Sequence, residues 1–418
     1  MRNIFVSKSS KKQFWYNITF YIMSLITLNV FCPYIEGHFL SFIPFTLLLV
    51  LFVISALFSR RRISKTSAFY LVTVIFFLSW FYICLYKHSN MISYKRMILS
   101  ISIALISSIL ILEIIDNLSV NLIIGIIVLS SIVTILISVP YIKDNYLIVR
   151  TMATGTIEID KKLGIGGYDF IYCLSLLSPV LLISLKVTNG IKRIIIAIAL
   201  ALSIFYSVIC GLAITIIITL FGFALYFLLG IKNVRTRRFI IISLVLMSTF
   251  IFLFGADILV SFFSWLSSIS NNTIIKDKAY DIILLLKGVS EQHGTISGRI
   301  TRYNISIETF FDSPIWGGFL FDSNAKFGGH STILDYCALT GLIGVGSYIA
   351  IIINIYKKAA SILRTKLAKY VLWEVFFMYS LLVATKNVGY ASIVWTVFLL
   401  TPCVIVWADK LISKGVES

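Results

Sequence analysis

Charged residues are scarce in this sequence of 418 residues: they make up 13% of the chain, whereas 59% of the residues are hydrophobic. That balance excludes a water-soluble globular domain, because about a quarter of the residues in such a domain are charged. The mean hydropathy of +0.98 points the same way. We therefore expect an integral membrane protein that crosses the bilayer several times.

Other signals are missing as well. The six cysteines show no C-x-x-C spacing, so neither a disulfide framework nor a zinc site is indicated. The first apolar run has the length of a membrane span and lacks a small-residue cleavage site, which favours a retained helix over a removed signal peptide. No internal repeat or low-complexity segment is present. The sequence therefore predicts a single membrane domain over residues 1–418.

Long apolar runs are what the sequence has instead. About 20 apolar residues in a helix cross the ~30 Å hydrocarbon core, and a helix satisfies its own backbone hydrogen bonds there. The expected fold is all-α and polytopic, with about twelve transmembrane helices, and one long apolar stretch is divided at Cys210-Gly211. The predicted spans are residues 14–33, 39–58, 67–86, 96–115, 120–142, 169–187, 193–209, 211–230, 239–260, 333–356, 369–386 and 389–408.

Basic residues predict the orientation of these spans, because Lys and Arg beside span ends are retained in the cytoplasm. With both termini cytoplasmic, the short inside segments hold most of the basic residues. The net charge of +18 is then an orientation signal that also favours anionic lipid headgroups. It does not indicate nucleic-acid binding.

Two predicted outside loops are too long to be simple connections, which usually have only a few residues. The first external loop covers residues 143–168, and the large external loop covers residues 262–332, between the ninth and tenth spans. Within the second, "GRITRYNISIETFFDSP" has apolar residues at helical spacing and predicts a helix that ends at Pro314.

Arg299 and Arg302 fall on one face of that predicted helix. Two guanidinium groups three residues apart can hold a phosphate or diphosphate, so the pair favours an anionic, lipid-linked substrate. The alternative interpretation is that both arginines contact ordinary lipid headgroups, or that they pair with Glu308 and Asp312.

His330 precedes the tenth predicted span, where Ser331 or Thr332 is a good N-cap and Thr332 with Asp335 resembles a capping box. The positive end of the helix disfavours imidazolium, which leaves a neutral ring able to act as a general base. A histidine at a helix start is, alternatively, a structural hydrogen-bonding residue.

A longer pattern connects these residues: His330-Ser331, nine residues, and then Gly341-Leu-Ile-Gly344, preceded by Arg299, Pro314 and Gly317-Gly318. This resembles the signature of the bacterial O-antigen polymerase (Wzy) and O-antigen ligase superfamily over residues 297–346. The resemblance implies an inner-membrane glycosyltransferase that acts on undecaprenyl pyrophosphate-linked glycans at the periplasmic face, without a metal or other cofactor. A polysaccharide chain-length regulator is among the partners it suggests.

The resemblance also implies roles for single residues. Arg299 would bind the donor pyrophosphate with help from Arg302, and His330 would orient or deprotonate the acceptor hydroxyl, or contact the pyrophosphate. Many relatives carry a Ser-Arg-Gly element between two middle spans, and here Ile209-Cys210-Gly211 lacks the guanidinium. Arg150, in the first external loop, is the substitute that we predict; a solvated charge balanced by Glu158 or Asp160 is the alternative.

Further polar residues complete the predicted site. Tyr168 and Asp169, at the entrance of the sixth span, are expected to contact sugar or support the arginine. Asp322 is either an alternative base or part of a polar turn. Lys386 and Asn387 are treated as markers of the turn between the last two spans, or as weak phosphate contacts.

Two other functions compete with repeat-unit polymerisation. An O-antigen ligase would use the same donor and transfer the glycan to lipid A-core. A flippase or other transporter should show two similar halves and charges within its spans. The sequence predicts a membrane interior without such charges, which favours catalysis at the outer surface.

Overall fold

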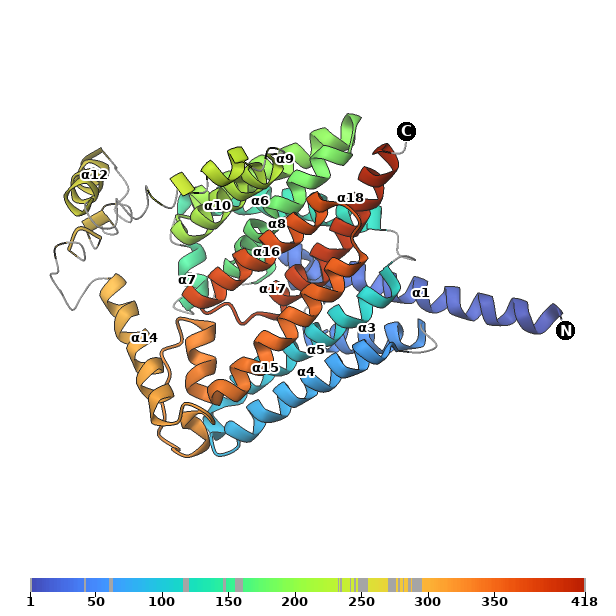
Figure 1. Ribbon diagram of the computed structural model, residues 1–418, viewed down its shortest axis with the longest axis horizontal. Coiled ribbons are helices and arrows are strands. Elements are labelled where there is room, and N and C mark those ends of the chain that lie inside the picture. The colour runs from blue at the N-terminus through green and yellow to red at the C-terminus, as the bar shows by residue number, and fades with distance from the viewer. Residues whose placement is uncertain are drawn as a thin grey trace.

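The computed structural model describes residues 2–40, 43–59, 63–115, 120–145, 148–154, 161–231, 235–240, 255–269 and 295–416, together with one to three residues at a time elsewhere between 233 and 287. Throughout these ranges the regular structure is helical, without strands (Figure 1). Helices satisfy their own backbone hydrogen bonds in lipid, so this architecture suits the apolar composition. The chain is a polytopic helical membrane protein, as the sequence predicted.

The principal helices vary in length from one turn to about eight. They are α1 (Arg2–Phe31), α2 (Pro33–Ile35), α3 (Phe45–Ser59), α4 (Lys65–Cys84), α5 (Ile92–Ile114), α6 (Val120–Asp144), α7 (Ile148–Thr154), α8 (Tyr168–Val187), α9 (Gly190–Ile209), α10 (Ala213–Gly230), α12 (Ala256–Ile269), α14 (Thr295–Asp312), α15 (Thr332–Ile362), α16 (Lys366–Thr385), α17 (Ala391–Trp395) and α18 (Thr401–Val416).

Nine helices in the described ranges are long and apolar enough to cross a membrane. They match nine of the twelve predicted spans. The predicted span 39–58 falls on a pair of helices, Pro33–Leu40 and Phe45–Ser59, bent by 90°, and the span 211–230 falls on the shorter helix α10. The predicted division at Cys210-Gly211 is confirmed, because Gly211 has a φ of +62° and α9 ends just before it. Half of the span 239–260 lies outside the described residues.

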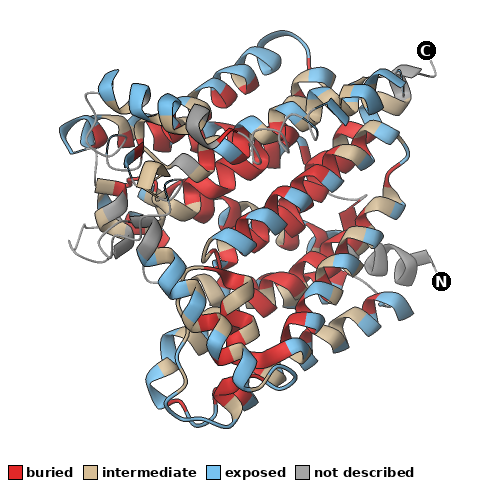
Figure 2. Cartoon of the chain, turned by 60° about the vertical axis from the view of Figure 1, so that its left-hand side comes forward, coloured by how far each residue is buried: buried red, intermediate tan, exposed pale blue. Residues whose placement is uncertain are grey.

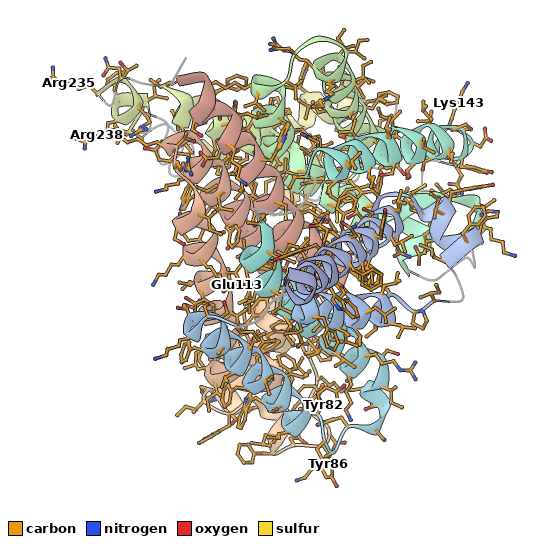
Figure 3. The ribbon with its side chains drawn as sticks, turned by 90° about the vertical axis from the view of Figure 1, so that its right-hand side faces the viewer. Tyr82, Tyr86, Glu113, Lys143, Arg235 and Arg238 are labelled. Atoms are coloured by element: carbon orange, nitrogen blue, oxygen red, sulfur yellow. The ribbon has the colours of Figure 1, made fainter. Side chains whose placement is uncertain are left out.

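The connections between spans gather at two ends of the molecule. At one end, Ser64 donates to Glu113 over 2.6 Å, and Glu113 also pairs with Lys358. At the other end, a ring nitrogen of His88 lies 3.0 Å from the carbonyl oxygen of Phe319. Figure 3 shows Arg235 and Arg238 on one side of the molecule and Lys143 and Tyr86 away from them. We name the two ends after the predicted orientation: the end at Glu113 and Lys358 is called the inner end, and the end at His88 and Phe319 the outer end.

The most buried helical segments lie in the middle of the bundle (Figure 2). The last span, Ala391–Ser413, runs through a π-helical turn at Thr396–Leu400, and its Trp395 is fully buried. Helix α14 lies along one side of this bundle, and α12 stands apart from it in Figure 1. Helix α14 and the second half of α12 belong to the predicted loop 262–332, which is therefore partly helical, whereas α12 begins within the predicted span 239–260.

The tenth predicted span is broken, although the sequence predicted a continuous helix over 333–356. At Gly341, φ is +60° and ψ is −164°, so α15 consists of two helical segments. The freed groups bond elsewhere: Leu342 N–H donates to Pro314 O over 2.8 Å, and the indole N–H of Trp80 donates to Thr340 O over 2.9 Å. Non-helical backbone is tolerated at membrane depth when other protein groups satisfy it in this way.

The prediction of a membrane interior without charges is wrong. Glu374 of α16 is fully buried, and neither carboxyl oxygen has a hydrogen-bond partner among the described residues. Asp335, near the start of α15, is also fully buried. Ionisable residues inside spans mark functional positions by default, so the membrane interior no longer argues against a transporter by itself.

Candidate functional site

Helix α14 forms as predicted and ends at Asp312, just before Pro314. The helix does not bury all of its apolar side chains, because Ile300 is 43% exposed and Phe311 is 69% exposed. The buried residues are Ser306 and Thr309. Ser306 donates to Asp335 Oδ1 over 2.8 Å, and Thr309 donates to Lys326 O over 2.6 Å. The helix therefore packs through a polar edge, next to the face that carries its two arginines.

The segment before His330 is held against α14 by its backbone. Gly328 N–H donates to Ser306 Oγ over 2.8 Å, and Gly329 N–H donates to Asp335 Oδ1 over 3.1 Å. A Cβ at position 328 would overlap the carbonyl of Arg302. Glycine at this position allows the chain to approach the helix that closely.

The connection between α16 and α17 holds the other side of the His330 segment. Thr332 N–H donates to Lys386 O over 3.0 Å, and Asn387 Nδ2 donates to Gly329 O over 3.3 Å. The phenol of Tyr303 donates to Thr385 O over 2.8 Å and ties α14 to the same connection. Three segments that are distant in the sequence therefore form one hydrogen-bonded unit at the outer end.

Ser331 is the N-cap of α15, and its hydroxyl accepts from Leu334 N–H over 3.3 Å. That part of the prediction is confirmed. The predicted capping box is wrong, because Oδ1 of Asp335 accepts hydrogen bonds from Ser306 and Gly329 and is turned toward α14. Asp335 is a positioning residue that joins α14, the loop and α15.

His330 is half-buried, and several causes lower its pKa. Burial is the largest, followed by the positive charges of Arg302, Arg299 and Lys386; a hydrogen bond at the Gly329 backbone opposes them. The imidazole is therefore neutral at neutral pH. We call Arg299, Arg302 and Lys386 the cationic cluster, because all three act on this one ring.

The start of α8 lies close to the cationic cluster. Asp169 accepts a hydrogen bond of 3.4 Å from Ser392, and Tyr168 lies beside Tyr172, with ring centroids 6.2 Å apart. Tyr172 in turn interacts electrostatically with Arg299. The structure thus brings Tyr168 and Asp169 into the neighbourhood of Arg299, as a shared site requires.

The two remaining predicted residues contribute less. Arg150 lies in the short helix α7, and its side chain is outside the described part of the structure. Asp322 is exposed, and its Oδ1 accepts from Asn324 N–H over 2.8 Å. This is the geometry of the polar turn that was the alternative interpretation of Asp322.

Lys386 is the functional candidate that the sequence interpretation underrated. A lysine in a short connection looks like a span marker, and nothing local reveals that its charge acts on His330. Its place on the predicted outer side, next to the last span, was the available signal. Asn387, Ser306 and Asp335 were likewise recognisable only from their contacts.

This arrangement can bind an anion. Three positive charges, two of them planar guanidinium groups, lie near enough to His330 to lower its pKa, and the ring precedes the N-terminus of α15. Phosphate groups favour such an environment. No protein-family model matches the chain, and no curated protein matches it.

Proposed function

We propose that this protein is an O-antigen polymerase-type glycosyltransferase that joins undecaprenyl pyrophosphate-linked oligosaccharide units at the periplasmic face of a bacterial inner membrane. The observation that carries the proposal is that the His330 segment is hydrogen-bonded both to α14, which carries Arg299 and Arg302, and to the connection that contains Lys386. The resemblance of residues 297–346 to the polymerase and ligase superfamily supports the same assignment.

The proposed step is a displacement at the anomeric carbon of the donor glycan. The acceptor hydroxyl oxygen forms a bond to that carbon, while the bond between the carbon and the diphosphate oxygen breaks and its electron pair leaves with the diphosphate. The hydroxyl proton passes to the neutral imidazole of His330. The cationic cluster stabilises the charge that develops on the diphosphate. Attack opposite the leaving group inverts the configuration at the anomeric carbon.

The proposed setting follows from the charge pattern and the two-ended fold. Twelve spans with both termini in the cytoplasm would place the cationic cluster outside. The undecaprenyl chain would remain in the bilayer beside the bundle, while its diphosphate meets the cluster at the headgroup level. No dissolved nucleotide sugar is required, because the donor is already activated by its diphosphate.

The test is polymerisation by the purified protein in lipid, supplied with lipid-linked repeat units from its host. Arg299→Ala and His330→Ala should each reduce chain extension on the order of 100-fold or more, which is the size of effect expected from removing a transition-state contact or a general base. Arg96→Ala is the matched control, because Arg96 is an exposed arginine of α5 outside the cluster.

Wild-type chain extension by both site variants would contradict the proposal. Transfer of a finished glycan to lipid A-core, with no chain extension, would replace the polymerase assignment with that of a ligase. Movement of the lipid-linked unit across the bilayer without bond formation would indicate a transporter.

A further inference from the structure

A polar cavity lies at the outer end of the bundle, next to the cationic cluster. It has a volume of about 240 Å³, and the polar side chains along its wall include Asn29, Glu36, Asp169 and Ser392. Phe45 and Met97 supply apolar surface. The wall comes from α1, the π-helical turn after α2, α3, α5, α8 and α17, and from the connection before α17.

Asn29 is the most buried of the polar residues named in this wall. It is only 8% exposed, and it borders the cavity. An amide both donates and accepts hydrogen bonds. An occupant of the cavity with hydroxyl groups can therefore pair with both of its ends.

The chemistry of the wall favours a sugar ring. Carboxylates such as Glu36 and Asp169 accept hydrogen bonds from hydroxyls, and the Asn29 amide both donates and accepts. Phe45 and Met97 match the apolar C–H face of a pyranose. Drug-sized ligands occupy pockets of roughly 300–1,000 Å³, so this smaller cavity suits one ring-sized unit.

The position of the cavity connects it to the cationic cluster. Gly389 and Tyr390 border the cavity and follow Lys386 and Asn387 in the same connection. Ser392 also borders the cavity, and it donates to Asp169 over 3.4 Å. The connection that holds the His330 segment therefore continues into the wall of the cavity.

We infer that this cavity is the subsite for the terminal sugar of the acceptor glycan, held by Asn29, Glu36 and Asp169 beside the cationic cluster. The inference rests on the proposed function, because an acceptor exists only if the protein joins glycans. It assigns two separate tasks to the outer end. The cationic cluster takes the diphosphate, and the cavity takes the hydroxylated sugar.

The test measures binding to the two parts separately, on the full-length protein in lipid nanodiscs. One probe is the repeat-unit oligosaccharide released from its lipid, and the other is sugar-free undecaprenyl diphosphate. Asn29→Ala and the conservative Glu36→Gln should weaken oligosaccharide binding about tenfold, the scale of one lost hydrogen bond, and leave lipid diphosphate binding unchanged. Arg302→Ala should show the reverse pattern. Asn121→Ala, at an exposed asparagine outside this cavity, is the matched control.

Oligosaccharide affinities equal to wild type in both cavity variants would overturn the inference, even if the protein polymerises glycans. Glycan binding that depends on Asn29 and Glu36, in a protein that forms no product, would leave the cavity as a glycan-binding site but contradict both its acceptor role and the polymerase assignment. Binding of Ca²⁺ that is lost in Glu36→Gln, with no oligosaccharide binding by the wild type, would show a cation site and also overturn the inference.

Discussion

At the scale of single residues, the central feature is a histidine that positive charge keeps neutral. The field of a helix N-terminus was the expected cause. The structure adds burial and three cationic side chains, all of which lower the pKa of His330. A neutral ring can accept a proton from a sugar hydroxyl, which an imidazolium cannot do. The same charges that would bind the diphosphate thus maintain the protonation state of the base.

Lys386→Met tests this coupling. The positive charge of Lys386 disfavours protonation of the ring, so its removal lets the pKa of His330 rise toward its usual value. The ring is then protonated at a higher pH, and activity that needs the neutral ring is lost there. The acidic limb of kcat/KM against pH should therefore move to higher pH. Lys326→Met, at an exposed lysine in the loop before His330, should leave the limb in place. If the acidic limb of Lys386→Met coincides with that of the wild type, Lys386 does not influence the pKa of the general base.

At this scale the sequence predicted which residues are candidates for the site, but it did not predict which of them lie close together. Arg299, Arg302 and His330 were singled out from helical spacing and a motif, and the structure brings them together. Lys386 follows His330 by more than fifty residues, and no local pattern links the two. The role of Asp335 was mistaken because a capping box and a bridge to α14 use the same residue types.

At the scale of elements, the broken helix α15 positions the site. The segment Pro314–Gly317, which follows α14, packs into the break, where Ile343 N–H donates to Ile315 O over 3.3 Å. Gly317 has a φ of +92°, and Gly341 has a φ of +60°. The two glycines of the motif segment thus let α14 and α15 dock backbone to backbone.

Gly341→Ala should disrupt this docking. A Cβ at position 341 would overlap the carbonyl of Ile315, and its positive φ costs a residue with a side chain about 1–3 kcal/mol. We expect a lower Tm in detergent and a loss of activity. Gly346→Ala is the matched control, because it lies in the same helix with nothing within 4 Å of an added Cβ. Equal melting temperatures for the two variants would mean that the break is not required.

Element prediction succeeded where the signal was local and failed where it was not. Periodicity and Pro314 located α14, and Gly211 marked the division between α9 and α10. The break at Gly341 has no such signal, since the residues around it are apolar and lack proline. Its stabilising partners, Trp80, Pro314 and Ile315, come from other elements. Hydropathy alone therefore describes α15 as one continuous span.

At the scale of the whole molecule, the alternating direction of the spans explains why the site residues lie at one end. Successive spans run in opposite directions, so α8 and α15 begin at the end where α16 finishes. That geometry brings Asp169, His330 and Lys386 to the same end. Charge counting along the sequence predicted this grouping, because it assigned all three to the outside. It could not predict the cavity, whose wall comes from six helical elements and the connection before α17.

The orientation of the bundle in the membrane is the last prediction. Lys326 and Lys366 are both exposed and belong to opposite ends of α15, the first before its start and the second after its end. Cysteines at these positions can be probed with a membrane-impermeant maleimide. A Cys337→Ser background is suitable, because the other five cysteines are buried. Lys326→Cys should be labelled in intact spheroplasts, and Lys366→Cys only after permeabilisation, since Lys366 lies among the basic residues that are predicted to be retained in the cytoplasm. The reverse pattern would put the cationic cluster in the cytoplasm, where the proposed periplasmic reaction could not occur. Labelling of both from one side would contradict the two-ended arrangement itself.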